Sequence, residues 1–147
     1  MNRSILLPIL VALGTGAAIG LQGPMNSLLT KSIGLLESTF VVLISGAIVT
    51  GVALLLGLGN GNLFRISQAP LISLAGGVVG ILIITGVVYT ISKLGVAAGV
   101  AVALIAQLAL AATIDHFGLF GVDKHPASLW TFVGIALLVV GAVAIRR

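Results

Sequence analysis

The chain has 147 residues, of which 59% are hydrophobic and 7% charged, and its mean hydropathy is +1.32. This composition excludes a soluble globular domain and is typical of a polytopic helical membrane protein. The net charge is +4, but the basic residues are spread between apolar runs, so they predict membrane orientation and not a nucleic-acid surface. Cysteine is absent, which excludes a disulfide framework and a Cys-ligated metal site.

Charges and turn residues divide the chain into five apolar stretches, each near the roughly 20 residues that a transmembrane helix requires. The first has the outline of a secretory signal, but the further apolar stretches indicate a retained first helix. The run 71–114 has Lys93 as its only charge and would be roughly 66 Å long as a helix, so a turn is expected at SKLG, 92–95. We therefore predict an all-α protein with a single transmembrane domain, 1–147, whose spans are 5–29, 39–58, 71–89, 96–113 and 129–145.

The first predicted span contains GAAIGLQGPMNSLLTK, 16–31, in which a proline interrupts an apolar pattern. Pro24 cannot donate to the carbonyl of Gly20, and nearby glycines lower the cost of bending, so a helix break is expected at Gly20, Gly23 and Pro24. In hydrocarbon a freed carbonyl needs another partner, and irregular backbone is tolerated where it is buried in protein or lines a wet cavity. The stretch is therefore either a candidate binding site or a plain kink whose polar neighbours tie helices together.

Small residues recur at four-residue spacing in three of the predicted spans. This spacing places them on one helix face, where helix backbones can approach closely in lipid. The longest series runs along the fourth span and contains no bulky aliphatic residue, which predicts a packed face. The series are Gly16 and Gly20; Gly76 and Gly80; and Gly95, Gly99, Ala103, Gln107 and Ala111.

Five spans would place the termini on opposite sides of the membrane, so Lys and Arg can be counted for each side. One side carries three and the other four, a bias too small to fix one orientation. The chain is therefore expected either to insert both ways and form an antiparallel homodimer of ten helices, or to insert once with its C-terminus inside. The three are Arg3, Arg65 and Lys124, and the four are Lys31, Lys93, Arg146 and Arg147.

Three segments together resemble a known family: GLQGPMNSLL, 20–29; QLALAATIDHFGLFG, 107–121; and WTFVGIALLVVGAVAI, 130–145. Over essentially its whole length the chain resembles the YdcZ-type family of small bacterial membrane proteins in the drug/metabolite transporter superfamily. The most specific pieces are LQGPMNS, 21–27, and IDHFGLFG, 114–121. The resemblance implies about five transmembrane helices, a multi-pass location in the bacterial inner membrane, and single dual-topology proteins, oppositely oriented pairs or fusions. It does not imply a particular solute.

Polar side chains inside the predicted spans are the default functional candidates, because each needs a partner or water. Gln22 and Asn26 lie four residues apart and share a helix face with Thr15. Gln107 lies near the middle of the fourth span, where its amide can both donate and accept. We predict that Gln22, Asn26, Ser27 and Gln107 contact a solute; the alternative is that they join helices, worth roughly 0.6 to 2 kcal/mol each.

Ionisable residues lie at the ends of the predicted spans and not in their middles. Asp115 and His116 are a candidate proton-responsive pair, because imidazole titrates near neutrality, or else they cap the fourth helix at the membrane interface. His116 and His125 are nine residues apart with acids nearby, a weak metal pattern, so no metal is expected. A catalytic triad, a Walker loop and a dinucleotide fingerprint are missing from the sequence, so neither a cofactor nor enzymatic activity is expected.

These observations favour a secondary membrane transporter that alternates access in a dual-topology homodimer. Its expected partners are a second copy of the chain, membrane lipid and a small-molecule solute, without nucleic acid. Because few charges could neutralise a ligand, the solute is expected to be small and polar, zwitterionic or weakly cationic. The alternatives are a non-transporting membrane subunit and a narrow pore lined by Gln and Asn.

Overall fold

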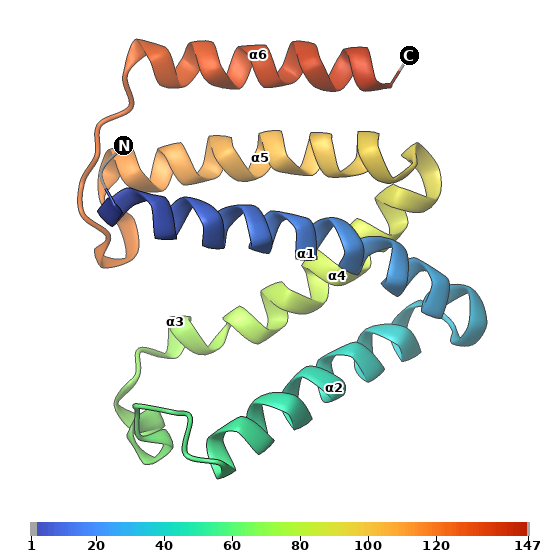
Figure 1. The fold of residues 1–147 in the computed structure, drawn as a ribbon, viewed down its shortest axis with the longest axis vertical. Coiled ribbons are helices and arrows are strands. Elements are labelled where there is room, and N and C mark those ends of the chain that lie inside the picture. The colour runs from blue at the N-terminus through green and yellow to red at the C-terminus, as the bar shows by residue number, and fades with distance from the viewer. Residues whose placement is uncertain (1–2, 147) are drawn as a thin grey trace. The chain divides into compact units, whose positions relative to one another are not determined.

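The computed structural model describes residues 3–146, and this part of the chain contains helices and loops without strands (Figure 1). It divides after Tyr89 into two compact units, which are described separately. The described all-α architecture agrees with the predicted fold class. Its elements are α1 (Arg3–Ile33), α2 (Leu35–Leu55), η1 (Leu63–Gln68), α3 (Leu71–Leu74), α4 (Gly76–Leu94), α5 (Val96–Phe117), η2 (Leu119–Gly121) and α6 (Leu129–Ile145).

Four stretches of the described chain are long and apolar enough to cross a membrane: Ile5–Ile33, Leu35–Leu55, Leu71–Leu94 and Val96–Phe117. Helix α6 is also apolar but shorter, with 17 residues. The third stretch is interrupted at Ala75, where the short helix α3 meets α4. The chain is therefore a helical membrane protein with four clear candidate spans and a shorter fifth apolar helix.

In the first unit, α1 and α2 form a helical hairpin joined by the single residue Gly34. Gly34 has φ 100° and ψ 162°, a backbone region that is essentially restricted to glycine. A Cβ at this position would also meet the carboxylate of Glu37. The Gly34 N–H donates to the carbonyl of Thr30 at 2.9 Å, and its own carbonyl accepts from the N–H of Ser38 at 3.1 Å. Glycine therefore permits one residue to end one helix and begin the next.

The structure corrects the expected helix break at Gly20, Gly23 and Pro24, because α1 is continuous from Arg3 to Ile33. Proline has a fixed φ near −65°, which a helix accepts, so Pro24 removes one backbone donor without ending the helix. The first helix consequently runs on to Ile33, beyond the predicted limit at residue 29. Lys31 lies in its last turn, where a cation interacts favourably with the helix dipole.

In the second unit, the predicted turn at 92–95 is confirmed, because α4 ends at Leu94 and α5 begins at Val96. Gly95 has φ 81° and ψ 167°, nearly the conformation of Gly34. A Cβ on Gly99 would lie 3.2 Å from Cγ2 of Thr90, so the two helix ends approach closely at this glycine. The predicted packed face is therefore found at Gly99, whereas Ala103, Gln107 and Ala111 are exposed in the structure.

Helices α5 and α6 lie side by side in the second unit and are joined by the segment that includes η2 (Figure 1). Helix α5 ends at Gly118, which has the left-handed φ of 67°. Helix α6 begins after Ser128, whose N–H donates to Oγ1 of Thr131 at 3.2 Å. This unit is consequently an antiparallel helix pair with a defined connecting loop.

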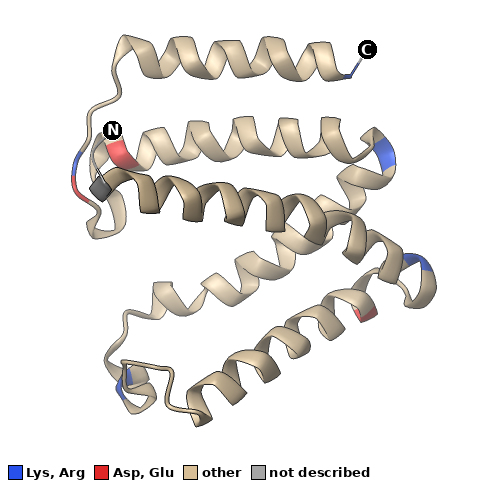
Figure 2. Ribbon diagram, viewed as in Figure 1, with Lys and Arg blue, Asp and Glu red and all other residues tan. Residues whose placement is uncertain are grey.

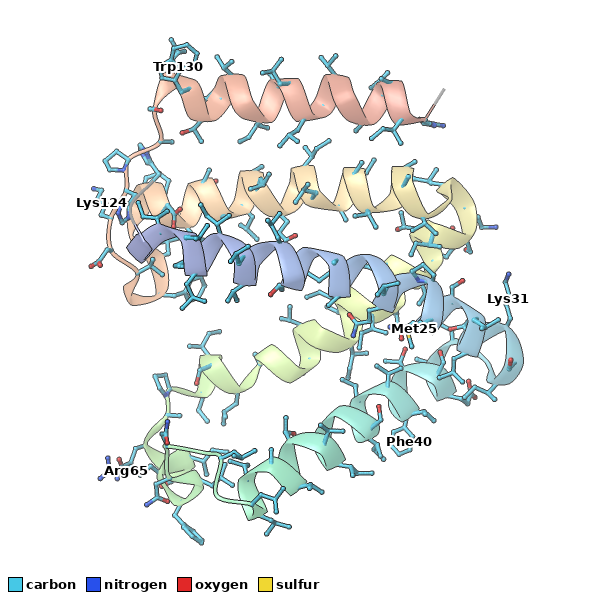
Figure 3. All side chains as sticks on the ribbon, in the orientation of Figure 1. Met25, Lys31, Phe40, Arg65, Lys124 and Trp130 are labelled. Atoms are coloured by element: carbon cyan, nitrogen blue, oxygen red, sulfur yellow. The ribbon has the colours of Figure 1, made fainter. Side chains whose placement is uncertain are left out.

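Charged residues are concentrated near helix ends and in loops, while the middles of the long helices lack them (Figure 2). Figure 3 shows Lys31 at the turn between α1 and α2, Arg65 in the η1 segment and Lys124 in the loop before α6. Of the charges counted for topology, Arg147 and the side chain of Arg3 lie outside the described part. The placement of the others is that of membrane-flanking residues.

Candidate functional site

Asn26 is the most deeply buried of the predicted solute-contacting residues, with 7% of its surface exposed. It lies on α1 between Gly23 and Thr30, and the spacing of three and four residues places these positions on one helix face. This face meets α2, because the hydroxyl of Thr30 lies 2.6 Å from that of Ser38. Asn26 therefore lies one turn from the polar contact that joins the two helices.

The contact between α1 and α2 is a short chain of hydroxyl hydrogen bonds. Ser38 is 1% exposed, and its hydroxyl donates to the carbonyl of Leu35 at 2.9 Å. Since a serine hydroxyl has one proton, Thr30 must be the donor in its bond to Ser38. Thr39, 3% exposed, also donates to the Leu35 carbonyl at 2.9 Å. Both buried hydroxyls are thus satisfied within the hairpin.

The predicted solute-contacting side chains differ from the other helix hydroxyls in their hydrogen bonding. Thr50, Thr85 and Thr113 each donate to a carbonyl of their own helix four residues earlier, at 2.8 to 2.9 Å. In residues 3–146, by contrast, the side chains of the four predicted solute contacts make no hydrogen bond. These four are Gln22, Asn26, Ser27 and Gln107.

The side-chain amide of Asn26 is nevertheless not completely enclosed by the rest of the chain. Within the described chain, every fully enclosed side-chain nitrogen or oxygen of a residue that is not exposed has a hydrogen-bond partner. Because the Asn26 amide has none, its polar atoms must keep some access to the outside of the chain. A small donor or acceptor can therefore reach this amide.

The structure brings only some of the predicted site residues together. Asn26 is buried and Ser27 half-buried beside it on α1, whereas Gln22 is exposed although it lies one turn earlier. Gln107 is exposed on α5 and belongs to the second unit. The candidate site in the first unit therefore consists of Asn26 and Ser27 next to the hydroxyl contact.

Asp115 and His116 lie in the last turn of α5 and accept hydrogen bonds from the loop that follows. The N–H of His125 donates to the backbone carbonyl of Asp115 at 2.8 Å, and the N–H of Ala127 donates to Nδ1 of His116 at 3.1 Å. Nδ1 must be unprotonated to accept this bond, so the neutral ring carries its proton on Nε2. The His116 ring also makes an edge contact with Phe117, with centroids 4.8 Å apart. In the structure this pair holds the loop at the helix end.

Sequence reasoning missed two buried hydroxyls: that of Ser38, which lies just before the predicted second span, and that of Thr39, which is the first residue of that span. A usable signal precedes them. Gly34 is a residue type that commonly ends a helix, and Glu37 three residues later is an acid of the kind found in the first turn of a helix, so this pattern indicates that the next helix starts at Leu35.

In the described residues, no group of three or more His, Cys, Asp or Glu side chains comes together as a metal site would need.

A model of the family described as "Putative inner membrane exporter, YdcZ" matches residues 7–144. The match covers nearly the whole chain and confirms the resemblance drawn from the motifs. Neither the search of curated proteins nor the search of solved structures found a match. With its long apolar helices, the chain is a multi-pass inner membrane protein.

Proposed function

The chain belongs to the YdcZ family, and on that premise we propose that it is a secondary carrier that works as a dual-topology, antiparallel homodimer. Membership in a family of inner membrane exporters supports a membrane transporter and fits a protein that is not an enzyme. The mechanism, the assembly and the class of solute are our proposals.

The observation that carries the proposal is the set of carboxamides without a hydrogen-bond partner in the described part of the chain. Gln22 and Gln107 are exposed within apolar helices, and Asn26 is buried without a bond. An unpaired amide facing hydrocarbon costs roughly 2 to 7 kcal/mol. Three unpaired amides, two of them exposed and one buried, therefore favour an arrangement in which a second copy, water or a solute gives them hydrogen-bond partners.

An antiparallel second copy supplies such an arrangement. With three and four basic residues on the two sides, the charge bias is small enough for insertion in both orientations. Two oppositely oriented copies reproduce the inverted repeat that many carriers contain in one chain, with the solute site near the membrane midplane. Gln107 lies in the middle of α5, so two copies of it would face this site.

The solute is a small polar, zwitterionic or weakly cationic molecule. Amides offer donors and acceptors without charge, and the middles of the described helices contain no acid or base that could neutralise a strongly charged ligand. A narrow pore and a non-transporting subunit are the alternatives. The non-transporting subunit requires that another membrane protein covers the exposed amides of Gln22 and Gln107.

Counterflow in proteoliposomes tests the proposal. Vesicles preloaded with one unlabelled solute from a panel of neutral, zwitterionic and cationic compounds should accumulate the labelled solute transiently, with saturation. Linear flux without saturation indicates a pore. No flux, together with stable capture of another membrane protein, indicates a subunit.

Gln107→Leu should abolish this counterflow while the dimer stays assembled, because the change removes the amide and keeps an apolar side chain on an exposed face. The matched control is Gln68→Leu, the same substitution in η1 outside the long helices, which should leave counterflow unchanged. Counterflow and dimer content are measured on the same preparations. Unchanged counterflow in Gln107→Leu would show that Gln107 is not a solute contact.

A further inference from the structure

The second unit contains a pocket of about 400 Å³ between α5, α6 and the loop that joins them. This volume is within the range of small-molecule sites, about 300 to 1,000 Å³. Most of its wall is apolar or small, whereas one end carries polar side chains. It is lined by Leu108, Ala111, Ala112, Asp115, His125, Pro126, Ala127, Thr131, Gly134, Ile135 and Leu138.

The polar end of the pocket presents hydrogen-bond acceptors. Asp115 is half-buried, and its carboxylate forms neither a hydrogen bond nor an ion pair with any described residue. Oγ1 of Thr131 already accepts from the N–H of Ser128 at 3.2 Å. Nδ1 of His125 lies 2.9 Å from the carbonyl oxygen of Asp123, so it must donate, and the neutral ring keeps its lone pair on Nε2.

The charges around this end favour a cation. Asp115, at the end of α5, is the one acid of the lining, and Asp123 lies in the loop that joins α5 to α6. Lys124 is the nearby base; its side chain is exposed and does not line the pocket. From α6, the lining residues are Thr131, Gly134, Ile135 and Leu138, none of which is charged. A carboxylate beside apolar walls is a site for a positive group that carries a hydrocarbon body.

The loop that completes this end is fastened at two points to the helix that carries the carboxylate. His125 is bonded through its N–H to the Asp115 carbonyl, and Ala127 through its N–H to His116, at 2.8 and 3.1 Å. These bonds hold His125 and Ala127 at the pocket before any ligand binds. Such preorganisation reduces the ordering cost of binding.

We propose that this pocket binds an organic ammonium ion with a short apolar tail, with the ammonium at Asp115 and the tail along α5 and α6. An ammonium group has three donors and matches the acceptors at the polar end. The site is distinct from the carboxamides of the proposed transport pathway. Binding here is therefore measured without transport, and failure of either proposal leaves the other standing.

The test compares hexylammonium with hexan-1-ol, which has a tail of the same length and no charge. The full chain is placed in phosphatidylcholine nanodiscs at pH 7, and calorimetric titrations are corrected with empty nanodiscs. Hexylammonium should bind saturably and at least about tenfold more tightly than hexan-1-ol. Absence of saturable binding, or equal binding of the alcohol, overturns the proposal and leaves a groove for lipid chains.

Two matched pairs of variants locate the site. Asp115→Asn should weaken hexylammonium binding about tenfold or more, whereas Asp123→Asn, in the exposed loop, should not. Ala112→Leu should fill the pocket and block binding, whereas Ala109→Leu, at an exposed position of α5 that does not line the pocket, should not. Helix content and the size of the purified particle check that each variant is folded. Equal binding by wild type and folded Asp115→Asn would overturn the assignment.

Discussion

Asn26→Leu is expected to reduce solute counterflow by at least about tenfold while leaving the protein as stable as the wild type. Asn26 is 7% exposed and makes no side-chain hydrogen bond in the described chain, so an apolar side chain of similar size breaks no existing bond. A solute that bonds to the amide, however, loses that partner. Counterflow is measured with the solute identified by the panel, and stability by thermal unfolding in detergent.

Measuring both counterflow and stability distinguishes the two roles of Asn26 that the sequence allows, contact with a solute and contact between helices. If Asn26 joins helices in the assembled protein, its replacement should destabilise the protein and reduce dimer content. Thr50→Val is the control, because the Thr50 hydroxyl is satisfied by the Gly46 carbonyl at 2.8 Å, and counterflow should be unchanged. Lower stability with normal counterflow in Asn26→Leu would contradict the solute-contact assignment.

Gly34→Ala is expected to destabilise the protein by roughly 1 to 3 kcal/mol. Its φ of 100° and ψ of 162° lie in a region that alanine avoids, and the added Cβ would meet the Glu37 carboxylate. Unfolding in SDS or by heat, followed by circular dichroism, measures the loss.

Substitutions of two other glycines show how much of this loss comes from backbone strain and how much from the contact with Glu37. Gly95 has almost the same backbone conformation, but a Cβ there has no neighbour within 4 Å in the described structure, so Gly95→Ala reports the backbone strain alone. Gly46 is inside α2 with open space around it, so Gly46→Ala should be neutral or stabilising. Gly34→Ala and Gly95→Ala should be destabilised to a similar extent, because the Glu37 carboxylate ends a flexible, exposed side chain that can move aside, and both should be less stable than Gly46→Ala. A Gly34→Ala variant as stable as Gly46→Ala would show that the hairpin does not depend on this glycine.

Much of the helical organisation follows from the sequence, because apolar runs of bilayer length have few alternatives to helix. The turn at 92–95 could be predicted for the same reason, since one helix over 71–114 would be roughly twice the bilayer core. The continuity of α1 through Pro24 could not be predicted from the sequence. Pro24 removes one backbone hydrogen bond, but this loss does not reveal whether the neighbouring residues keep helical angles. The early start of α2 was missed because Glu37 and Ser38 look like loop residues, although the hydroxyl of Ser38 is satisfied by Leu35.

The candidate site was predictable only as a set of residue types. That Asn26 is buried and Gln22 exposed depends on which face of α1 meets α2, and α1 is apolar on all sides, so its sequence does not define that face. The role of His116 also depends on a distant contact, the bond from Ala127. The pocket beside Asp115 arises from residues of two helices and a loop, and sequence spacing alone could not join them.

Insertion in both orientations is the central structural claim, and single-cysteine labelling tests it most directly. The natural sequence has no cysteine, so Ser32→Cys and Val122→Cys each introduce one thiol without removing a counted charge, at turns that the topology count places on opposite sides of the membrane. Intact cells are treated with a membrane-impermeant maleimide, and the labelled fraction is compared with that after permeabilisation. The account predicts about half labelling from outside at each position. Complete labelling at one position and none at the other would contradict it.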